Sequence, residues 1–240
     1  MEAKDRLIVA LDVDIFEEAE GLIEKLSSEV DIFKVGIAPF TAFGEKLLNK
    51  LREKKKKCFL DLKVHDIPNT VRNAAKRAAE KNIFMINFHC IGGGKMLEAA
   101  VEGVAGSGVK KKPILLGVTV LTSMTEEDLI MMGIESKIEE KVIEFAGAAR
   151  KAGLNGVVAS AKEAKKIRER FGKDFVIVTP GIRPEWAEKG DQKRVLTPSE
   201  AISEGADYLV VGRPIIQADD PLNAAKRIIK EIKSGLKSGL

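Results

Sequence analysis

The feature that most constrains the fold is a regular alternation of short apolar runs with amphipathic segments along the chain. Eight runs rich in β-branched residues predict strands, at residues 7–11, 32–37, 58–64, 83–90, 114–120, 156–159, 175–179 and 208–211. The segments between them carry apolar residues at helical spacing, as in Val71, Ala74, Ala75, Ala78 and Ala79. Eight strand–helix repeats in 240 residues are typical of an α/β fold of the (β/α)8, or TIM-barrel, class.

The main alternative is an open, doubly wound parallel sheet. A dinucleotide-binding sheet of that kind would carry G-x-G-x-x-G directly after its first strand. Here the first predicted strand runs into Asp12-Val13-Asp14 without a glycine, so the barrel is the better prediction. No linker rich in proline, glycine or serine divides the chain, which predicts a single domain over residues 1–240.

Two connections are longer than the others and follow predicted strands. The segment 121–134 precedes a predicted helix at 137–151, and the segment 180–198 follows the seventh predicted strand. Loops that follow strands emerge at the catalytic end of a (β/α)8 barrel. We therefore expect both segments to be lids over a site.

The composition excludes several classes of protein. The chain has 40 basic and 36 acidic residues, and its net charge of +4 is spread out except for the run 54–57, which predicts no nucleic-acid partner. No apolar stretch approaches the roughly 20 residues that cross a bilayer, and the run 7–11 is too short for a signal peptide. Two cysteines, Cys58 and Cys90, are too few for a disulfide framework and suit a reducing compartment. We expect a cytoplasmic protein without a membrane partner or a zinc site.

The balance of polar residues suggests a high working temperature. Gln192 and Gln217 are the only glutamines, whereas lysine and glutamate are abundant. Proteins of thermophiles often show this pattern, because surface ion-pair networks help and labile amides are avoided. A mesophilic protein with a lysine-rich surface would look the same, so both interpretations remain open.

Polar residues gather where the predicted strands end, which is the functional end of such a barrel. In the third strand, alternation places Asp61 and Lys63 on one face and Leu60, Leu62 and Val64 on the other. A stabilising ion pair is the simplest alternative, but buried charges are costly and are often replaceable by apolar groups. A functional cluster is therefore favoured. The full set of such positions is Asp12, Lys34, Asp61, Lys63, His89, Thr119, Thr122, Ser160, Arg183 and Arg213.

Two glycine–arginine motifs follow the last two predicted strands. Segment 180–184 reads P-G-I-R-P, and segment 211–214 reads V-G-R-P. Glycine lets backbone N–H groups approach an anion and arginine adds a charged fork, and these two loops form the common phosphate site of (β/α)8 barrels. The run Gly92-Gly93-Gly94-Lys95 resembles a P-loop only superficially, and we expect a tight strand-to-helix turn there.

At residues 61–70 the sequence reads D-L-K-V-H-D-I-P-N-T, which resembles the signature of the orotidine 5′-phosphate decarboxylase family in its shorter bacterial form. The shorter pattern D-x-K-x-x-D is shared with related sugar-phosphate barrels, whereas the ten-residue pattern is much more specific. The resemblance covers essentially the whole chain. It includes segments 11–12, 33–36, 121–123, 179–183 and 211–215.

The resemblance implies decarboxylation of orotidine 5′-monophosphate to UMP and CO2, the last step of de novo pyrimidine nucleotide synthesis, without a cofactor or metal. It implies that Lys63 protonates C6, that Asp61 lies beside the substrate carboxylate, and that Lys34 and Asp66 complete a charge row. It also implies a homodimer in which Asp66 and Thr70 reach the partner's site. The implied substrate contacts are Asp12, Lys34, Asp61, Ile67, Thr70, Thr122, Ser123, Pro180, Arg183, Gln192, Gly212 and Arg213.

Two other functions remain open at this point. A related-barrel 3-keto-gulonate 6-phosphate decarboxylase or hexulose-phosphate synthase shares the short D-x-K-x-x-D pattern, and the resemblance would make such an enzyme magnesium-dependent. A non-catalytic sensor of nucleotide phosphates would keep the anion site but would have no need of Lys63.

Overall fold

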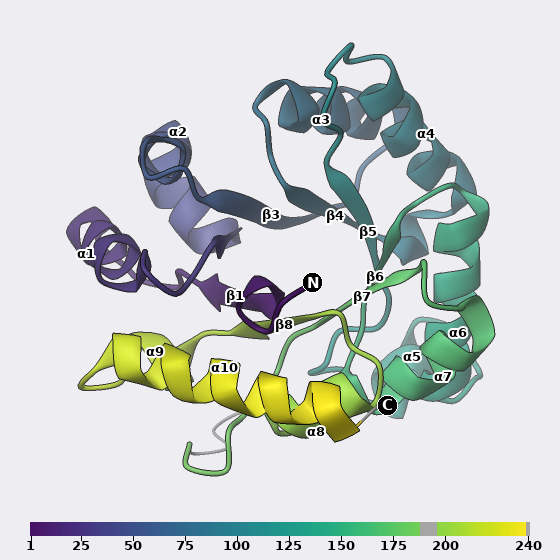
Figure 1. The fold of residues 1–240 in the computed structure, drawn as a ribbon. Coiled ribbons are helices and arrows are strands. Elements are labelled where there is room, and N and C mark those ends of the chain that lie inside the picture. Colours follow the sequence, from purple (N-terminus) through teal and green to yellow (C-terminus); the bar gives the residue numbers. More distant parts are fainter. Residues whose placement is uncertain (188–195, 239–240) are drawn as a thin grey trace.

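The computed structural model describes residues 1–187 and 196–238 and contains a closed barrel of eight parallel strands in chain order (Figure 1). Pairing of β1 with β8 closes the barrel, which confirms the predicted (β/α)8 fold and excludes the open sheet. The strands are β1 Leu7–Ala10, β2 Ile32–Gly36, β3 Lys57–Val64, β4 Met85–His89, β5 Ile114–Val118, β6 Gly156–Val158, β7 Val176–Thr179 and β8 Tyr208–Val211.

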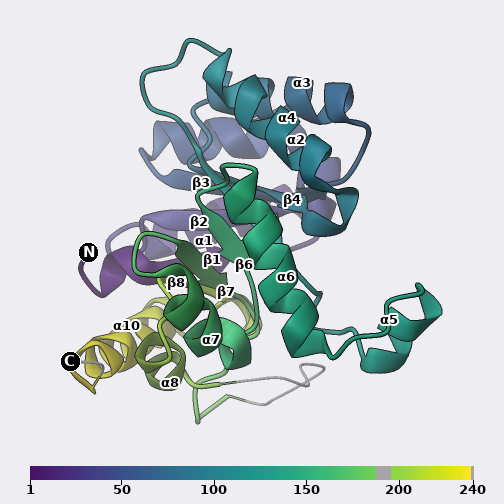
Figure 2. The ribbon, with the colours of Figure 1, turned by 90° about the vertical axis from the view of Figure 1, so that its right-hand side faces the viewer.

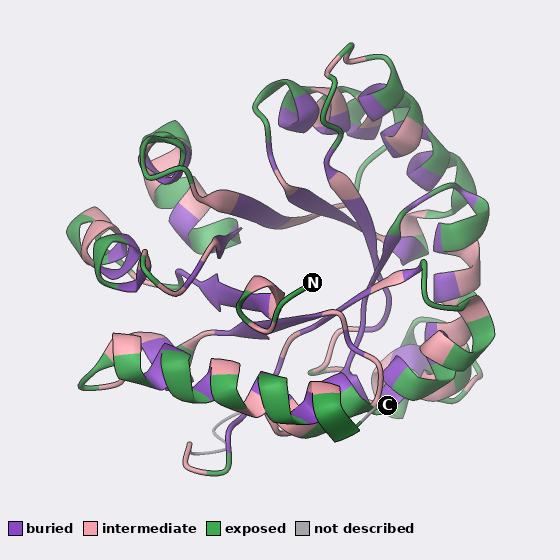
Figure 3. Cartoon of the chain, in the orientation of Figure 1, coloured by how far each residue is buried: buried purple, intermediate pink, exposed green. Residues whose placement is uncertain are grey.

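Helices surround the barrel, with their buried faces toward the strands and their polar faces outward (Figure 3). The α-helices are α1 Phe16–Leu26, α2 Ile37–Glu53, α3 Pro68–Glu80, α4 Gly94–Ala105, α5 Glu126–Met131, α6 Ile138–Lys151, α7 Ala161–Phe171, α8 Pro198–Ser203, α9 Arg213–Ile216 and α10 Pro221–Ser238. Two 3-10 turns, η1 Lys4–Arg6 and η2 Cys90–Gly92, complete the described elements.

The strands bury both of their faces, as is usual for a parallel sheet covered by helices. One face packs against the helices, as Leu60 and Phe88 do. The other fills the barrel interior, as Phe59 and Met85 do. Because side chains alternate along a strand, the residue two positions beyond Phe59 faces the interior again, nearer the carboxyl end. That residue is Asp61, so a charged side chain lies at the carboxyl end of the apolar barrel interior.

The two long connections differ in what the structure shows. The first holds α5, whose start is fixed by a capping box between Thr125 and Asp128. This helix stands away from the barrel wall beyond α6 (Figure 2). The second connection includes residues 188–195, which lie outside the described residues. The glycine run at 92–94 forms the expected tight turn, with Gly93 at φ 84° just before α4.

The contact between α3 and α4 supplies a test of the packing. A Cβ atom on Gly103 of α4 would lie 2.1 Å from the carbonyl oxygen of Arg72 on α3. Because backbone must move to accept it, we expect Gly103→Ala to lower the free energy of unfolding by about 1–3 kcal/mol. Gly21→Ala in α1, where a Cβ would meet nothing within 4 Å, is the control, and it should stabilise by about 0.5–1 kcal/mol. Urea unfolding of both variants measures the difference, and equal stabilities would contradict this packing.

Two observations bear on the protein's surroundings. Cys58 and Cys90 are both free and buried, and burial raises the pKa of each thiol to about 12. Both thiols are therefore protonated and unreactive at neutral pH. Within residues 1–187 and 196–238, no helix combines the length and the apolar character needed to span a membrane.

Candidate active site

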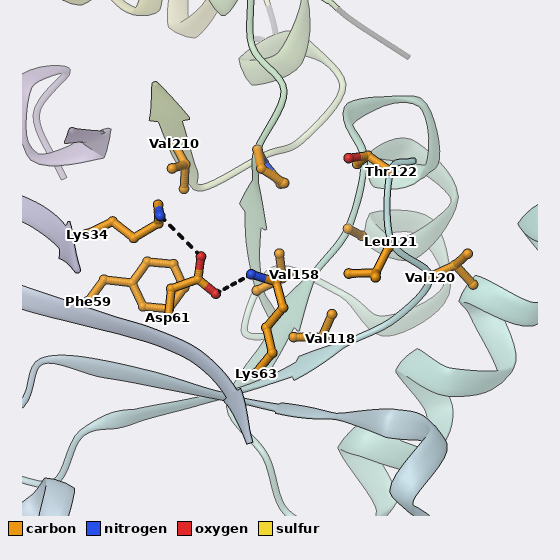
Figure 4. Close-up of a pocket in the computed structure, with 12 residues that line it drawn as sticks. Lys34, Phe59, Asp61, Lys63, Val118, Val120, Leu121, Thr122, Val158 and Val210 are labelled. Carbon is orange, nitrogen blue, oxygen red and sulfur yellow. Dashed lines mark hydrogen bonds and ion pairs between the residues drawn. The ribbon is translucent and has the colours of Figure 1, made fainter. Parts of the chain in front are cut away.

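A cavity of about 150 Å³ opens at the carboxyl ends of the strands, in the mouth of the barrel (Figure 4). Its charged wall consists of Lys34 from β2 and Asp61 and Lys63 from β3. The remaining wall is mostly apolar. Its residues are Phe59, Val118, Val120, Leu121, Thr122, Val158, Ala159, Pro180 and Val210.

The three charged residues form a continuous network with the carboxylate in the middle. Asp61 Oδ1 lies 2.8 Å from Lys63 Nζ, and Asp61 Oδ2 lies 3.5 Å from Lys34 Nζ. The side chains of Asp61 and Lys34 are each only 11% exposed, whereas the Lys63 side chain is 29% exposed and reaches toward the cavity. The network places an ammonium at the edge of an apolar cavity, where charge interactions are stronger than in water.

The network lowers the pKa of Asp61. Burial alone would raise the pKa of this carboxyl group, but the charges of Lys34 and Lys63 and the hydrogen bonds from Lys63 and Asn87 outweigh it. The net pKa lies below the usual value of 3.8, so Asp61 is ionised at neutral pH. Burial lowers the pKa of the nearby His89, with the charges of His65 and Lys63 acting in the same direction. This keeps His89 largely neutral.

The backbone of β3 departs from regular alternation next to the site. The register between β3 and β4 shifts between Leu60 and Val64, and Lys63 has φ 49°, in the left-handed region. A non-glycine residue held there costs about 1–3 kcal/mol and is often found at functional sites. The predicted assignment of side chains to the two faces of β3 is correct, because Leu62 and Val64 pack toward the helices. The strand is not regular, however, and the bulge brings the Lys63 ammonium to the Asp61 carboxylate.

Asn87 on β4 is a site residue that the sequence analysis missed. It is fully buried, donates a hydrogen bond to Asp61 Oδ1 at 2.7 Å and accepts one from the Lys63 backbone N–H at 2.8 Å. An asparagine two residues beyond an inward-facing methionine was the available signal, since alternation directs it to the level of Asp61. The apolar residues of the cavity wall were missed because nothing distinguishes them from core.

A third ion pair, between Lys34 and Asp12, extends the network to the rim. Asp12, which follows β1, accepts a hydrogen bond from Lys34 Nζ at 3.0 Å, and its side chain is 55% exposed. Gly36 leaves room for this pair, because a Cβ there would lie 2.9 Å from Lys34 Nζ. Lys34 therefore links an exposed carboxylate at the rim to the buried carboxylate of Asp61.

The predicted substrate contacts fall into three groups. Thr122 and Pro180 line the cavity with the charged residues, whereas Ser123 is exposed beside it. In the seventh loop Arg183 is 8% exposed, and its Nη1 donates to the carbonyl oxygen of Ile182 at 2.9 Å. Gly212 caps the short helix α9, and Arg213 begins it with an exposed side chain. Gln192 lies outside the described residues.

The segment after β3 projects into solvent. Every residue from His65 to Thr70 is exposed, including Ile67 at 66%. Asp66 does not pair with the network in this chain, and its Oδ1 accepts a hydrogen bond from the Ile67 backbone N–H at 2.6 Å. Within the described residues, the signature segment thus divides into an inward half at Asp61 and Lys63 and an outward half at 65–70.

A larger hollow, of about 490 Å³, lies at the opposite end of the barrel. Its arginines are bonded within the protein: Arg168 contacts the carbonyl oxygen of Gly205 and the carboxylate of Asp207, and Arg6 donates to the carbonyl oxygen of Asp207. Residues at this end of a (β/α)8 barrel serve stability, whereas chemistry takes place at the carboxyl end. The cavity around Asp61 is therefore the candidate active site.

Fold and site together define a class: a (β/α)8 barrel with a lysine–aspartate–lysine network in its mouth. A model of the orotidine 5′-phosphate decarboxylase / HUMPS family matches residues 5–228, and the chain belongs to that family. Two relatives are both named orotidine 5′-phosphate decarboxylase. The one from Moorella thermoacetica is 48% identical over 97% of this chain and 94% of its own length, and the one from Syntrophotalea carbinolica is 46% identical over 100% and 99%.

A solved structure supports the same assignment. The crystal structure of orotidine 5′-phosphate decarboxylase from Lactobacillus acidophilus matches with a TM-score of 0.84 and 38% identity, covering 95% of this chain and 99% of that chain. The likeness therefore extends over the entire barrel.

Proposed function

We propose that this protein decarboxylates orotidine 5′-monophosphate to UMP and CO2, without a cofactor, as the last step of pyrimidine nucleotide synthesis. The observation that carries the proposal is the Lys34–Asp61–Lys63 network in a mostly apolar cavity, in a chain of this family. The names of the relatives at 46–48% identity specify the substrate.

The chemistry requires charge stabilisation at one carbon. When the bond between C6 and the carboxylate breaks, CO2 leaves and the electron pair remains on C6. The Lys63 ammonium donates a proton to C6, which gives UMP, and Lys63 then recovers a proton from water. A fixed ammonium in a cavity that excludes water stabilises the developing carbanion. Asp61 accepts a hydrogen bond from that ammonium and holds it in place. In the proposed complex Asp61 lies beside the substrate carboxylate.

The rest of the substrate extends toward the rim. Asp12 and Lys34 bind the ribose hydroxyls, and Thr122, Ser123 and Pro180 border the pyrimidine. The phosphate is bound by Gly212 and Arg213, and the family resemblance also implies phosphate contacts by Arg183 and Gln192. Because the phosphate is remote from C6, its binding energy can organise the site around the transition state.

The residues present fit a metal-free reaction. Asp61 already accepts hydrogen bonds from Lys63 and Asn87 and pairs with Lys34, which leaves it poorly suited to bind Mg²⁺. In the described part of the chain, no three histidine, cysteine or acidic side chains gather as a metal site. The experiment is an assay of orotidine 5′-monophosphate in excess EDTA. Full turnover supports the proposal and excludes the metal-dependent alternative, whereas turnover that requires added Mg²⁺ would contradict a metal-free reaction.

We also propose a homodimer in which Asp66 and Thr70 enter the partner's site. The support is exposure: Ile37, Ile67 and Ile91 follow the three neighbouring strands β2, β3 and β4 and are 56%, 66% and 44% exposed. Exposed apolar residues clustered at one rim are typical of an interface. Asp66 from a partner would extend the charge row beyond Lys63.

Three broader expectations accompany the function. We propose that residues 1–240 act as one domain and that the protein works in the cytoplasm, where its thiols stay reduced. We also propose a thermophilic source. Its support is an ion-pair network between α1 and α2, in which Lys50 contacts Glu20 and Glu24, and Lys54 also contacts Glu24.

Gly36→Ala tests the Lys34–Asp12 pair without removing a charge. The added Cβ would displace the flexible end of Lys34 while leaving the backbone in place. We expect kcat/KM to fall by about 10-fold or more, because small displacements of positioned groups are costly in catalysis. The midpoint of urea unfolding should change little. An unaltered kcat/KM would show that the pair contributes nothing to substrate binding or turnover.

Arg213→Ala tests the phosphate site. We expect the affinity for UMP to fall by about 10-fold or more, because a charge-assisted hydrogen bond is worth about 1.5–3 kcal/mol. The affinity for uridine, which lacks the phosphate, should stay nearly unchanged. Isothermal titration of both ligands measures the difference, and equal losses for the two ligands would place Arg213 away from the phosphate.

A further inference from the structure

Asn87 is the most deeply buried polar side chain next to the charged network. It lies on β4 with 0% exposure, at the level where the apolar barrel interior gives way to Asp61. A buried amide is costly unless its hydrogen bonds are satisfied. Both ends of the Asn87 amide form hydrogen bonds with β3. The oxygen accepts from the Lys63 backbone N–H, and the nitrogen donates to the Asp61 carboxylate. These two hydrogen bonds therefore offset the cost of burying the Asn87 amide.

Those contacts lie where the two strands lose register. Leu60 is opposite Ile86 and Val64 is opposite Phe88, so three residues of β3 face the single residue Asn87. The Asn87 side-chain oxygen accepts a hydrogen bond from the Lys63 backbone N–H at 2.8 Å, in the irregular stretch of the ladder. At the bulge, the side-chain oxygen of Asn87 thus accepts the hydrogen bond that a backbone carbonyl oxygen would accept in a regular ladder.

The Asn87 amide also orients the carboxylate of Asp61, which lies beside the Lys63 ammonium. Its nitrogen donates to Asp61 Oδ1 at 2.7 Å, the oxygen that also accepts from Lys63 Nζ at 2.8 Å. Lys63 is therefore held at both ends: at its backbone by Asn87 directly, and at its ammonium through the oriented carboxylate of Asp61. Its left-handed backbone, at φ 49°, is maintained against the preference of a lysine for extended conformations.

We propose that Asn87 is a positioning residue that sets the place of the Lys63 ammonium in the barrel mouth. The inference rests on the proposed decarboxylation, in which Lys63 donates the proton to C6. Without the amide, the backbone of Lys63 relaxes toward an extended conformation and Nζ moves relative to the substrate. Binding of the ribose and phosphate depends on other residues and is preserved.

The test uses two variants and a matched control. Asn87→Ala removes both hydrogen bonds. Asn87→Asp is nearly isosteric, keeps an acceptor for the Lys63 N–H and places a second carboxyl group against Asp61. Asn155→Ala is the control, because Asn155 likewise accepts a backbone N–H bond, from Leu115 at 2.8 Å, but at the opposite end of the barrel. Single-turnover rates, KM, UMP affinity and pH profiles are measured for each.

For Asn87→Ala we expect the single-turnover rate to fall by about 10²-fold, the loss typical of a displacement of about 1 Å. The affinity for UMP should stay within about threefold of wild type, which is a small free-energy change. In Asn87→Asp the two adjacent carboxyl groups should share a proton at low pH, so that the new side chain can donate as the amide does. Its rate should then fall as pH rises, which the wild type should not show.

The outcomes separate the inference from the proposed function. A wild-type protein that does not turn over orotidine 5′-monophosphate overturns the proposed function and the inference with it. An active wild type with Asn87→Asp at wild-type rate and pH profile overturns the inference alone. If Asn87→Ala does not fold, Asn87→Asp decides. Asn155→Ala should keep the wild-type rate, and an equal loss of rate there would show that the effect is a general one of stability.

Discussion

Lys63→Ala should lower kcat by at least about 10³-fold, since a general acid contributes about 10²–10⁴ and a fixed electrostatic donor about 10²–10³. The variant loses both contributions, because the same ammonium stabilises the charge at C6 and protonates it. UMP should still bind, because ribose and phosphate contacts remain. Stopped-flow absorbance of orotidine 5′-monophosphate measures the turnover, and isothermal titration measures the affinity for UMP.

Lys57→Ala is the matched control, because Lys57 begins the same strand at the opposite end of the barrel, where its ammonium lies 5.1 Å from the centre of the Phe84 ring. It should leave kcat unchanged. Turnover by Lys63→Ala close to the wild-type rate would contradict the role of Lys63. A protein that binds UMP but never decarboxylates, in wild type and variant alike, would instead be the nucleotide sensor.

Mixing two inactive variants should restore activity if the site is shared. Lys63→Ala and Asp66→Ala homodimers should each be strongly impaired. After random reassembly about half of the dimers are mixed, and two-fold symmetry lets each subunit borrow Asp66 from the other. One site of each mixed dimer then has both residues intact, so activity should recover to roughly a quarter of wild type. If Asp66 served its own chain, no site would be complete.

Exchange of subunits has to be shown independently, and native mass spectrometry of an isotope-labelled partner does so. Demonstrated exchange without recovery would contradict the crossing of Asp66 between subunits. A mixture of Lys63→Ala with Lys57→Ala tests whether an inactive partner impairs a complete site, since every Lys57→Ala subunit carries an intact Lys63 and its partner supplies an intact Asp66. That mixture should show about half of wild-type activity, as half of the sites are complete.

The barrel was predictable because a parallel sheet covered by helices needs apolar strands alternating with amphipathic helices. Strand ends were less predictable. The structure ends β5 at Val118, whereas the apolar run continues to Val120, which is buried and lines the cavity beyond the end of the strand. Helix α5 within the long connection was not foreseen either, since six residues are too few for a clear helical pattern.

The charged part of the site was predictable for a different reason. Charged residues such as Lys34 and Asp61 stand out in apolar strands because burial of charge is costly. Alternation from Met85 directs Asn87 to the level of Asp61, but its contact with the Lys63 backbone and the bulge at Lys63 were not predictable. Both depend on how β3 and β4 shift out of register. The pairing of Lys34 with Asp12 likewise depends on the space left at Gly36.

The most direct measurement is an NMR experiment in D2O with the wild-type protein, orotidine 5′-monophosphate and excess EDTA. The proposed reaction predicts loss of substrate, equal amounts of UMP and CO2, and deuterium at C6 of the UMP, because the Lys63 ammonium exchanges its protons with solvent. Under the same conditions, the Lys63→Ala protein should leave the substrate intact. Unchanged substrate with the folded wild-type protein, or turnover that appears only when Mg²⁺ is restored, would contradict cofactor-free decarboxylation as the function.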